Sequence, residues 1–87
     1  MTDEYNRIPG GTGRAVLEYL VRQLVDSPDD VVIEVAEGRP ARLILHVAPG
    51  DVGRVIGRRG RTAQAIRAVT RAAAALEGGD VFVDIAD

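Results

Sequence analysis

Apolar residues are spaced along the first half of the chain in a way that predicts one helix and two strands. Between positions 14 and 26 they recur every three or four residues, as on one side of an amphipathic helix: Leu17, Leu20, Val21 and Leu24. Two runs rich in β-branched residues follow at 31–37 and 41–48 and predict two strands joined by a short turn. In the second run, alternate aliphatic residues indicate one buried face: Leu43, Leu45 and Val47.

The second half is predicted to form two helices and a last strand. Pro49 and Asp51 suit the start of a short helix that ends near Ile56, with the Asp51 carboxylate complementing the helix dipole. A longer helix is expected from Arg61 to about Leu76, with these residues on its buried side: Ile66, Val69, Ala73 and Leu76. Glycines then suit a left-handed cap, and 81–86 forms a strand. The order α-β-β-α-α-β predicts an α+β domain with the helices over one sheet face.

Length and composition indicate a single folded domain. The chain has 87 residues, 46% of them hydrophobic, which is enough for one core. The polar, glycine-containing stretch 1–13 predicts a flexible N-terminal leader, with Thr12 as a helix cap, before a domain at 14–87. No apolar run reaches the roughly 18–20 residues of a membrane span, and no signal peptide is recognisable. The expected location is cytoplasmic, without membrane contact.

The residues of common catalytic and metal sites are scarce. The chain has a single histidine, His46, a single serine and no cysteine, so nucleophilic triads, disulfides and thiolate metal sites are excluded. Asp29 and Asp30 suit a turn better than a metal site. We therefore predict no enzyme activity, metal, cofactor or small-molecule substrate, and a structural role for His46. The three aromatic residues are too few for a stacking platform, and Tyr19 and Phe82 are expected to pack.

Charge is distributed unevenly along the chain. The net charge is −2, yet Val52 to Leu76 holds six arginines and no acid, while the rest has five arginines and thirteen acids. Such asymmetry predicts one local site for an anion on an otherwise acidic protein.

The arginines gather around the sequence Gly57-Arg58-Arg59-Gly60, between the last two predicted helices. Glycine permits backbone conformations that are barred to other residues, and the lack of a Cβ lets a phosphate backbone approach the peptide. Arginine side chains and the amides at the following helix N-terminus bind phosphate. The alternatives are an ordinary turn with solvated arginines and a helix-turn-helix DNA reader, which the flanking strands disfavour.

The segment VIGRRGRTAQAIR resembles the signature of KH domains, and its place after one helix and two strands resembles the type II arrangement. Together with LVDSPDDV upstream and VFVDIAD at the end, it is similar to the small bacterial single-domain proteins of the KhpA family. The resemblance covers 14–87 and implies a type II KH fold with a three-stranded mixed sheet.

The resemblance also implies a function, the binding of about four nucleotides of single-stranded RNA in a narrow groove. The residues that it places in contact with RNA are Arg54, Val55, Ile56, Gly57, Arg58, Arg59, Gly60, Arg61, Thr62, Gln64 and Arg67. The strand 43–47 and the turn 37–41 would form the opposite wall. Ala63 and Thr62 depart from the family pattern, and Ala63 would make the groove shallower. Members act as post-transcriptional regulators or RNA chaperones, as homodimers or with a second KH-containing protein.

Two other functions stay open at this point. The scaffold would serve as a protein-interaction adaptor if its surface bound a partner protein in place of RNA. Single-stranded DNA is the other alternative ligand, because only contacts to the 2′-hydroxyl distinguish the two sugars.

Overall fold

The structure, a computed structural model, describes residues 11–86. Within this range the elements follow the predicted order. Their bounds are Gly11–Leu24 for α2, Val32–Ala36 for β1, Ala41–His46 for β2, Val52–Ile56 for α3, Arg61–Ala75 for α4 and Val81–Ile85 for β3. Single 3₁₀ turns lie at Pro28–Asp30, Pro49–Asp51 and Arg58–Gly60.

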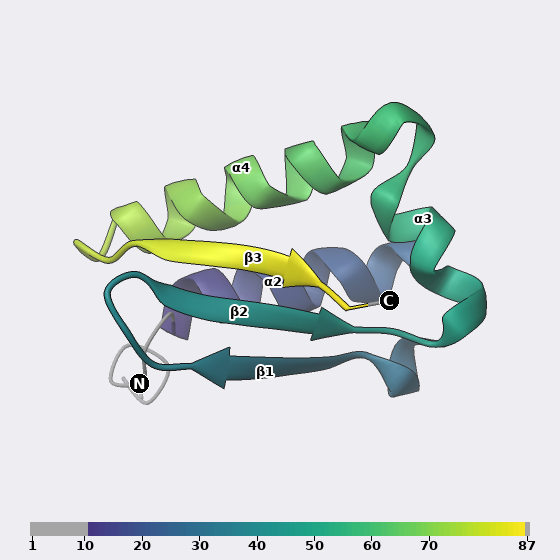
Figure 1. Ribbon diagram of the computed structural model, residues 1–87, viewed down its shortest axis with the longest axis horizontal. Coiled ribbons are helices and arrows are strands. Elements are labelled where there is room, and N and C mark those ends of the chain that lie inside the picture. The colour runs from purple at the N-terminus through teal and green to yellow at the C-terminus, as the bar shows by residue number, and fades with distance from the viewer. Residues whose placement is uncertain (1–10, 87) are drawn as a thin grey trace.

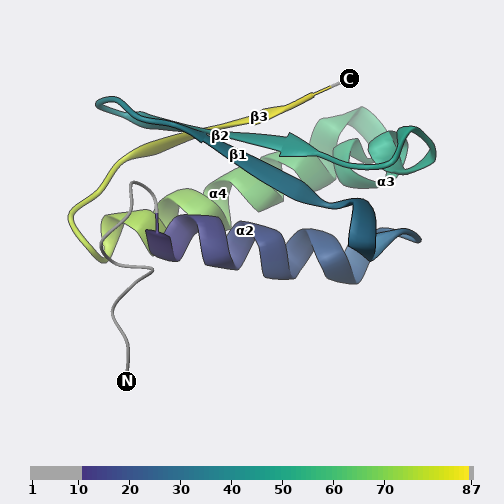
Figure 2. The ribbon, with the colours of Figure 1, turned by 90° about the horizontal axis from the view of Figure 1, so that it is seen from below.

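The three strands form one mixed sheet in the order β1-β2-β3. β1 runs antiparallel to β2, and β2 runs parallel to β3. The helices lie on one face of this sheet and leave the other face open (Figure 2). The chain therefore has the α+β architecture of a type II KH fold, as predicted.

The core lies between the sheet and the helices. Leu43 and Leu45 of β2 are fully buried and Val47, directly after the strand, packs against the core, which confirms the predicted alternation. On α2, Leu17 and Val21 are fully buried, but Leu24 is 41% exposed and Val25 takes its place in the core. The helix ends at Leu24, so the chain turns there and no longer follows the helical periodicity.

The predicted buried side of α4 is wrong at two of its four positions. Ile66 is buried, but Val69 is 48% and Leu76 is 87% exposed. The buried residues of this helix are Ala63, Ile66, Thr70 and Ala74. The reason is close packing of α4 on α2, where a Cβ on Gly13 would lie 3.3 Å from both the Ala74 Cβ and the Thr70 carbonyl oxygen. Such an approach leaves room only for small side chains at the contact.

The ends of the helices differ in how well they were predicted. α2 begins at Gly11, three residues before the expected start, so Thr12 lies inside the helix and its N–H lies 3.3 Å from Glu77 Oε1. The rest of the predicted leader, 1–10, lies outside the described residues. After α4, Gly78 has φ 74°, and the N–H groups of Gly78 and Gly79 bond to carbonyls of α4, which confirms the left-handed cap.

The expectation that Tyr19 and Phe82 are packing residues is wrong. Tyr19 is 65% and Phe82 is 49% exposed. Phe82 alternates with buried valines along β3, so its ring lies on the open face of the sheet. Among residues 11–86, no helix is both long and apolar enough to cross a membrane.

Candidate nucleic-acid interface

The turn Gly57–Gly60 joins α3 to α4 with an unusual backbone. Three of its four residues have positive φ: Gly57 at 75°, Arg59 at 59° and Gly60 at 72°. Hydrogen bonds from Gly57 N–H to the Gly53 carbonyl (2.9 Å) and from Gly60 N–H to the Gly57 carbonyl (3.1 Å) close the turn. The sequence signature therefore corresponds to a compact, fixed turn at the end of α3 (Figure 1).

The two glycines have different surroundings. A Cβ on Gly57 would overlap with Thr62 Oγ1 and would lie 2.7 Å from Thr62 Cβ. Thr62 thus fills the space on one side of the turn, and Ala63 next to it is buried. A Cβ on Gly60 would meet no atom within 4 Å, so this side of the turn is open to a ligand.

Arg59 is the one non-glycine residue with positive φ among the described residues. This left-handed conformation costs a residue with a Cβ about 1–2 kcal/mol. Local strain of this kind clusters at functional sites, where the rest of the fold maintains it.

Three arginines of the turn are exposed and have no acidic partner in the part of the chain that the structure describes: Arg58, Arg59 and Arg61. Gln64 and Arg71 continue along the exposed side of α4. This side of the turn therefore presents uncompensated positive charge beside the open face of Gly60.

Arg54 does not share this property, and the expectation that it stands apart from acids is wrong. Its Nη2 lies 2.8 Å from Asp26 Oδ2, and its Nε lies 3.3 Å from Asp51 Oδ1. The fold brings Asp26 next to Arg54 across 28 positions of sequence, which a count along the chain does not detect.

Arg67 connects α4 to the sheet. Its Nε donates to the carbonyl oxygen of Val83 at 3.0 Å. The Asp80 carbonyl and the Ala86 N–H bond to the β2 side. Because the backbone groups of successive residues in a strand point to opposite sides, the carbonyl of Val83 points away from β2, to the outer edge of β3. β2 is the central strand, and the element beside α4 is β3 (Figure 1). β3 therefore replaces the strand 43–47 as the wall that faces α4.

Two of the aliphatic residues next to the turn are internal, and one of them is Val55, which the resemblance placed in contact with RNA. Val55 is fully buried and Ile66 is 4% exposed, so both support the turn from beneath. Ile56, at the end of α3, is half-buried and is the one of the three that offers apolar surface next to the turn.

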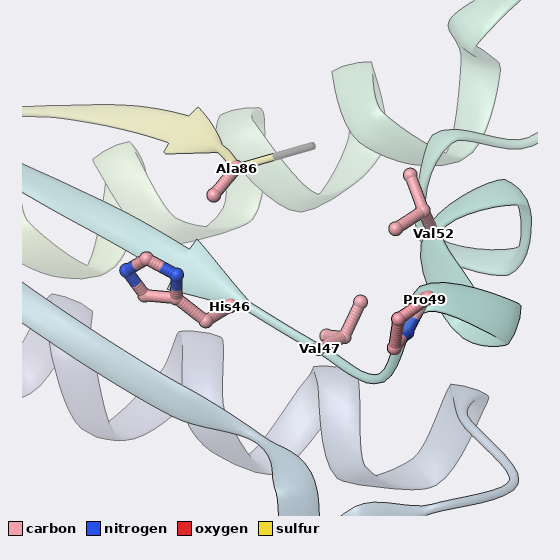
Figure 3. Close-up of a pocket in the computed structure, with 5 residues that line it drawn as sticks. All are labelled: His46, Val47, Pro49, Val52 and Ala86. Carbon is pink, nitrogen blue, oxygen red and sulfur yellow. The ribbon is translucent and has the colours of Figure 1, made fainter.

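A pocket lies at the other end of α3, where β2 and β3 end (Figure 3). It has a volume of about 460 Å³ and is lined by His46, Val47, Pro49, Val52 and Ala86. The lining is aliphatic apart from His46, whose Nε2 lies 3.0 Å from Glu34 Oε1, as expected of a structural histidine. In residues 11–86, no cluster of three or more histidine, cysteine or acidic side chains is arranged to hold a metal.

Comparison with known proteins assigns the family. The family described as KhpA/KhpB, KH domain matches residues 14–85. This chain belongs to the KhpA/KhpB family of KH domains. The matched segment includes the turn, the arginines around it, α4 and β3.

Individual KhpA proteins are similar to this chain over most of their length. The RNA-binding protein KhpA of Mycobacterium tuberculosis is 44% identical over 72 residues, which are 82% of this chain and 86% of the relative. The protein of the same name from Clostridium acetobutylicum is 44% identical over 73 residues, 83% of this chain and 97% of the relative. That of Streptomyces coelicolor is 46% identical over 72 residues, 82% of this chain and 87% of the relative.

Proposed function

We propose that this protein binds single-stranded RNA at the turn Gly57–Gly60. The observation that carries the proposal is the group of three exposed, unpaired arginines around a turn whose last glycine has no neighbour on its outer side. The names of the related KhpA proteins, which describe them as RNA-binding, support the same function.

In the proposed complex, about four nucleotides lie along the turn and the start of α4. Arg58, Arg59 and Arg61 bind phosphates, and the strand approaches the bare peptide at Gly60. Thr62 maintains the turn from within by filling the space against Gly57. Ile56 supplies apolar surface for a base, while Gln64 and Arg67 offer hydrogen-bond donors on α4.

A site for about four nucleotides carries little sequence information, so we propose that this protein reaches useful affinity by pairing, either with a second copy or with another KH protein. Two exposed apolar side chains, Val69 on α4 and Leu76 directly after it, provide surface for such pairing. The proposed role is that of a cytoplasmic post-transcriptional regulator or RNA chaperone without enzymatic activity, and the proposed RNA-binding domain is 14–87.

The proposal is tested by removing the charges of the turn. R58Q/R59Q should lower the affinity for a short unstructured RNA by at least tenfold, as measured by fluorescence anisotropy. The matched control R14Q/R22Q removes the same charge from α2, where both arginines pair with Glu18, and should bind as the wild type does. Equal affinity of the two double variants would show that the turn is not the site.

The salt dependence gives a second test. Three to four phosphate contacts on a single strand predict a log–log slope of about −2 to −3 for the wild type. DNA of the same length is measured in parallel. Tighter binding of DNA than of RNA would show that single-stranded DNA is the ligand. Failure to bind either nucleic acid, with recovery of a protein partner on α4, would favour the adaptor function.

A further inference from the structure

Asp51 is a buried carboxylate whose partners come from a distant part of the chain. Only 3% of the residue is exposed. Its Oδ1 accepts the backbone N–H of Asp26 at 3.1 Å, and its Oδ2 accepts that of Ser27 at 3.0 Å. Both amides lie where the chain leaves α2, so Asp51 joins this turn to the start of α3. Its side chain makes no capping hydrogen bond to its own helix.

Arg54 belongs to the same network. It bridges the carboxylates of Asp51 and Asp26 with two different nitrogens, Nε and Nη2. The Arg54 contacts with Asp26 and Asp51 offset its positive charge, and moving it away from Asp51 would remove an ion-pair partner from a buried carboxylate, which is costly. The three side chains together carry a net charge of −1, so this corner does not attract phosphate.

α3 depends on such contacts because it is short. It has five residues, of which only Val55 is buried. Isolated helices shorter than about 12–15 residues are marginal in water. Since the glycine turn begins directly after Ile56, the placement of α3 decides where the turn lies relative to β3.

We infer that Asp51 and Arg54 are positioning residues for the glycine turn, and that neither of them contacts RNA. They hold α3 against the end of α2, so that the turn stays in the orientation that binds a strand. This inference rests on the proposed function. It changes the role of Arg54 from a phosphate ligand to a residue that holds α3 in place.

A positioning role and a charge role predict opposite results for the same change. If Asp51 acted only through its charge, D51N would remove a negative group near an anionic ligand and tighten binding. If Asp51 positions α3, D51N weakens binding, because only a fraction of the molecules then holds the turn in the competent orientation.

The experiment compares charge-preserving variants at Arg54 and Arg58. A lysine cannot bridge two carboxylates as arginine does, but it still binds phosphate as a point charge. R54K should therefore bind a short unstructured RNA about fivefold more weakly, the effect of one lost hydrogen bond on the population of the competent orientation. Its salt slope should equal that of the wild type. R58K should keep an affinity close to that of the wild type. R54Q should keep the full salt slope, whereas the slope of R58Q should be smaller by about 0.7.

A second pair of variants covers the case in which D51N does not fold. D26N and D29N each remove one exposed acid from the same turn, but only Asp26 contacts Arg54. D26N should bind RNA more weakly than D29N, although both change the net charge equally. Circular dichroism and thermal melting establish that each compared variant is folded.

Several results would overturn the inference. They are a salt slope of R54Q that falls as far as that of R58Q, tighter binding by folded D51N, or equal affinities of R54K and the wild type. All of these are distinct from failure of the proposed function, in which R58Q/R59Q binds RNA like the wild type.

Discussion

Adding one methyl group to each glycine of the turn should have very different consequences for stability. Gly57 lies at φ 75° and ψ 173°, a region that is essentially restricted to glycine and costs other residues about 1–3 kcal/mol. A Cβ there would also overlap with Thr62, and overpacking of this kind costs about 1–3 kcal/mol. G57A should therefore lower the free energy of unfolding by about 2–6 kcal/mol.

G60A faces only the conformational cost. Gly60 lies at φ 72° and ψ 14°, in the ordinary left-handed region, and its Cβ would meet nothing within 4 Å. The expected loss is about 1–2 kcal/mol. The two variants should thus differ by about 2 kcal/mol, which corresponds to roughly 8–16 °C in Tm for a domain of this size.

Thermal unfolding followed by far-UV circular dichroism measures this difference, and RNA binding at a temperature where both variants are folded completes the test. G60A should bind RNA poorly despite its higher stability, because its methyl group occupies the open side of the turn. G60N should be more stable than G60A, since asparagine tolerates this conformation, yet bind no better. Equal melting temperatures for G57A and G60A would refute the conclusion that the Gly57 side of the turn is filled by Thr62 and the Gly60 side is open.

Three further predictions concern single side chains. T70V should raise the free energy of unfolding by about 1 kcal/mol in urea titrations, because the fully buried Thr70 hydroxyl has no hydrogen-bond partner; a lower urea midpoint would contradict this. R59G should stabilise the fold by about 0.5–1 kcal/mol, because the relief of left-handed strain exceeds the entropy that glycine adds to the unfolded chain. The same change should reduce the salt slope of RNA binding by about 0.7. An unchanged slope would remove Arg59 from the phosphate contacts. R67M should cost about 1 kcal/mol of stability by removing the hydrogen bond to Val83, and a melting temperature equal to that of the wild type would show that this bond contributes nothing.

The order of elements and the place of the turn could be predicted because both depend on local sequence. The alternation of Leu43 and Leu45, and the glycines that begin and end the turn, determine backbone conformation within a few residues. The orientation of α4 could not be predicted in the same way. It depends on Gly13, which admits α4 so closely that Thr70 and Ala74 face inward while Val69 is exposed.

The distribution of charge along the sequence predicted correctly that Arg58 and Arg59 have no acidic partner within residues 11–86, but it failed for Arg54. Arg58 and Arg59 lie at the tip of a connection, so their sequence neighbours are also their main spatial neighbours. Arg54 lies on a helix that packs against the end of α2. Its partner Asp26 is separated from it in the sequence by both β1 and β2. Paired charges of this kind are decided by topology, which a count of charges along the chain does not contain.

The parallel pairing of β2 with β3 has a consequence for how the binding surface assembles. Parallel neighbours need a long crossover, and here residues 47–80 form it, with the glycine turn inside. Contacts between residues so far apart in sequence form slowly, since a large loop must close first. The proposed RNA-binding surface should accordingly be among the last parts of the molecule to become ordered during refolding. It should also be among the first to be lost when β3 detaches.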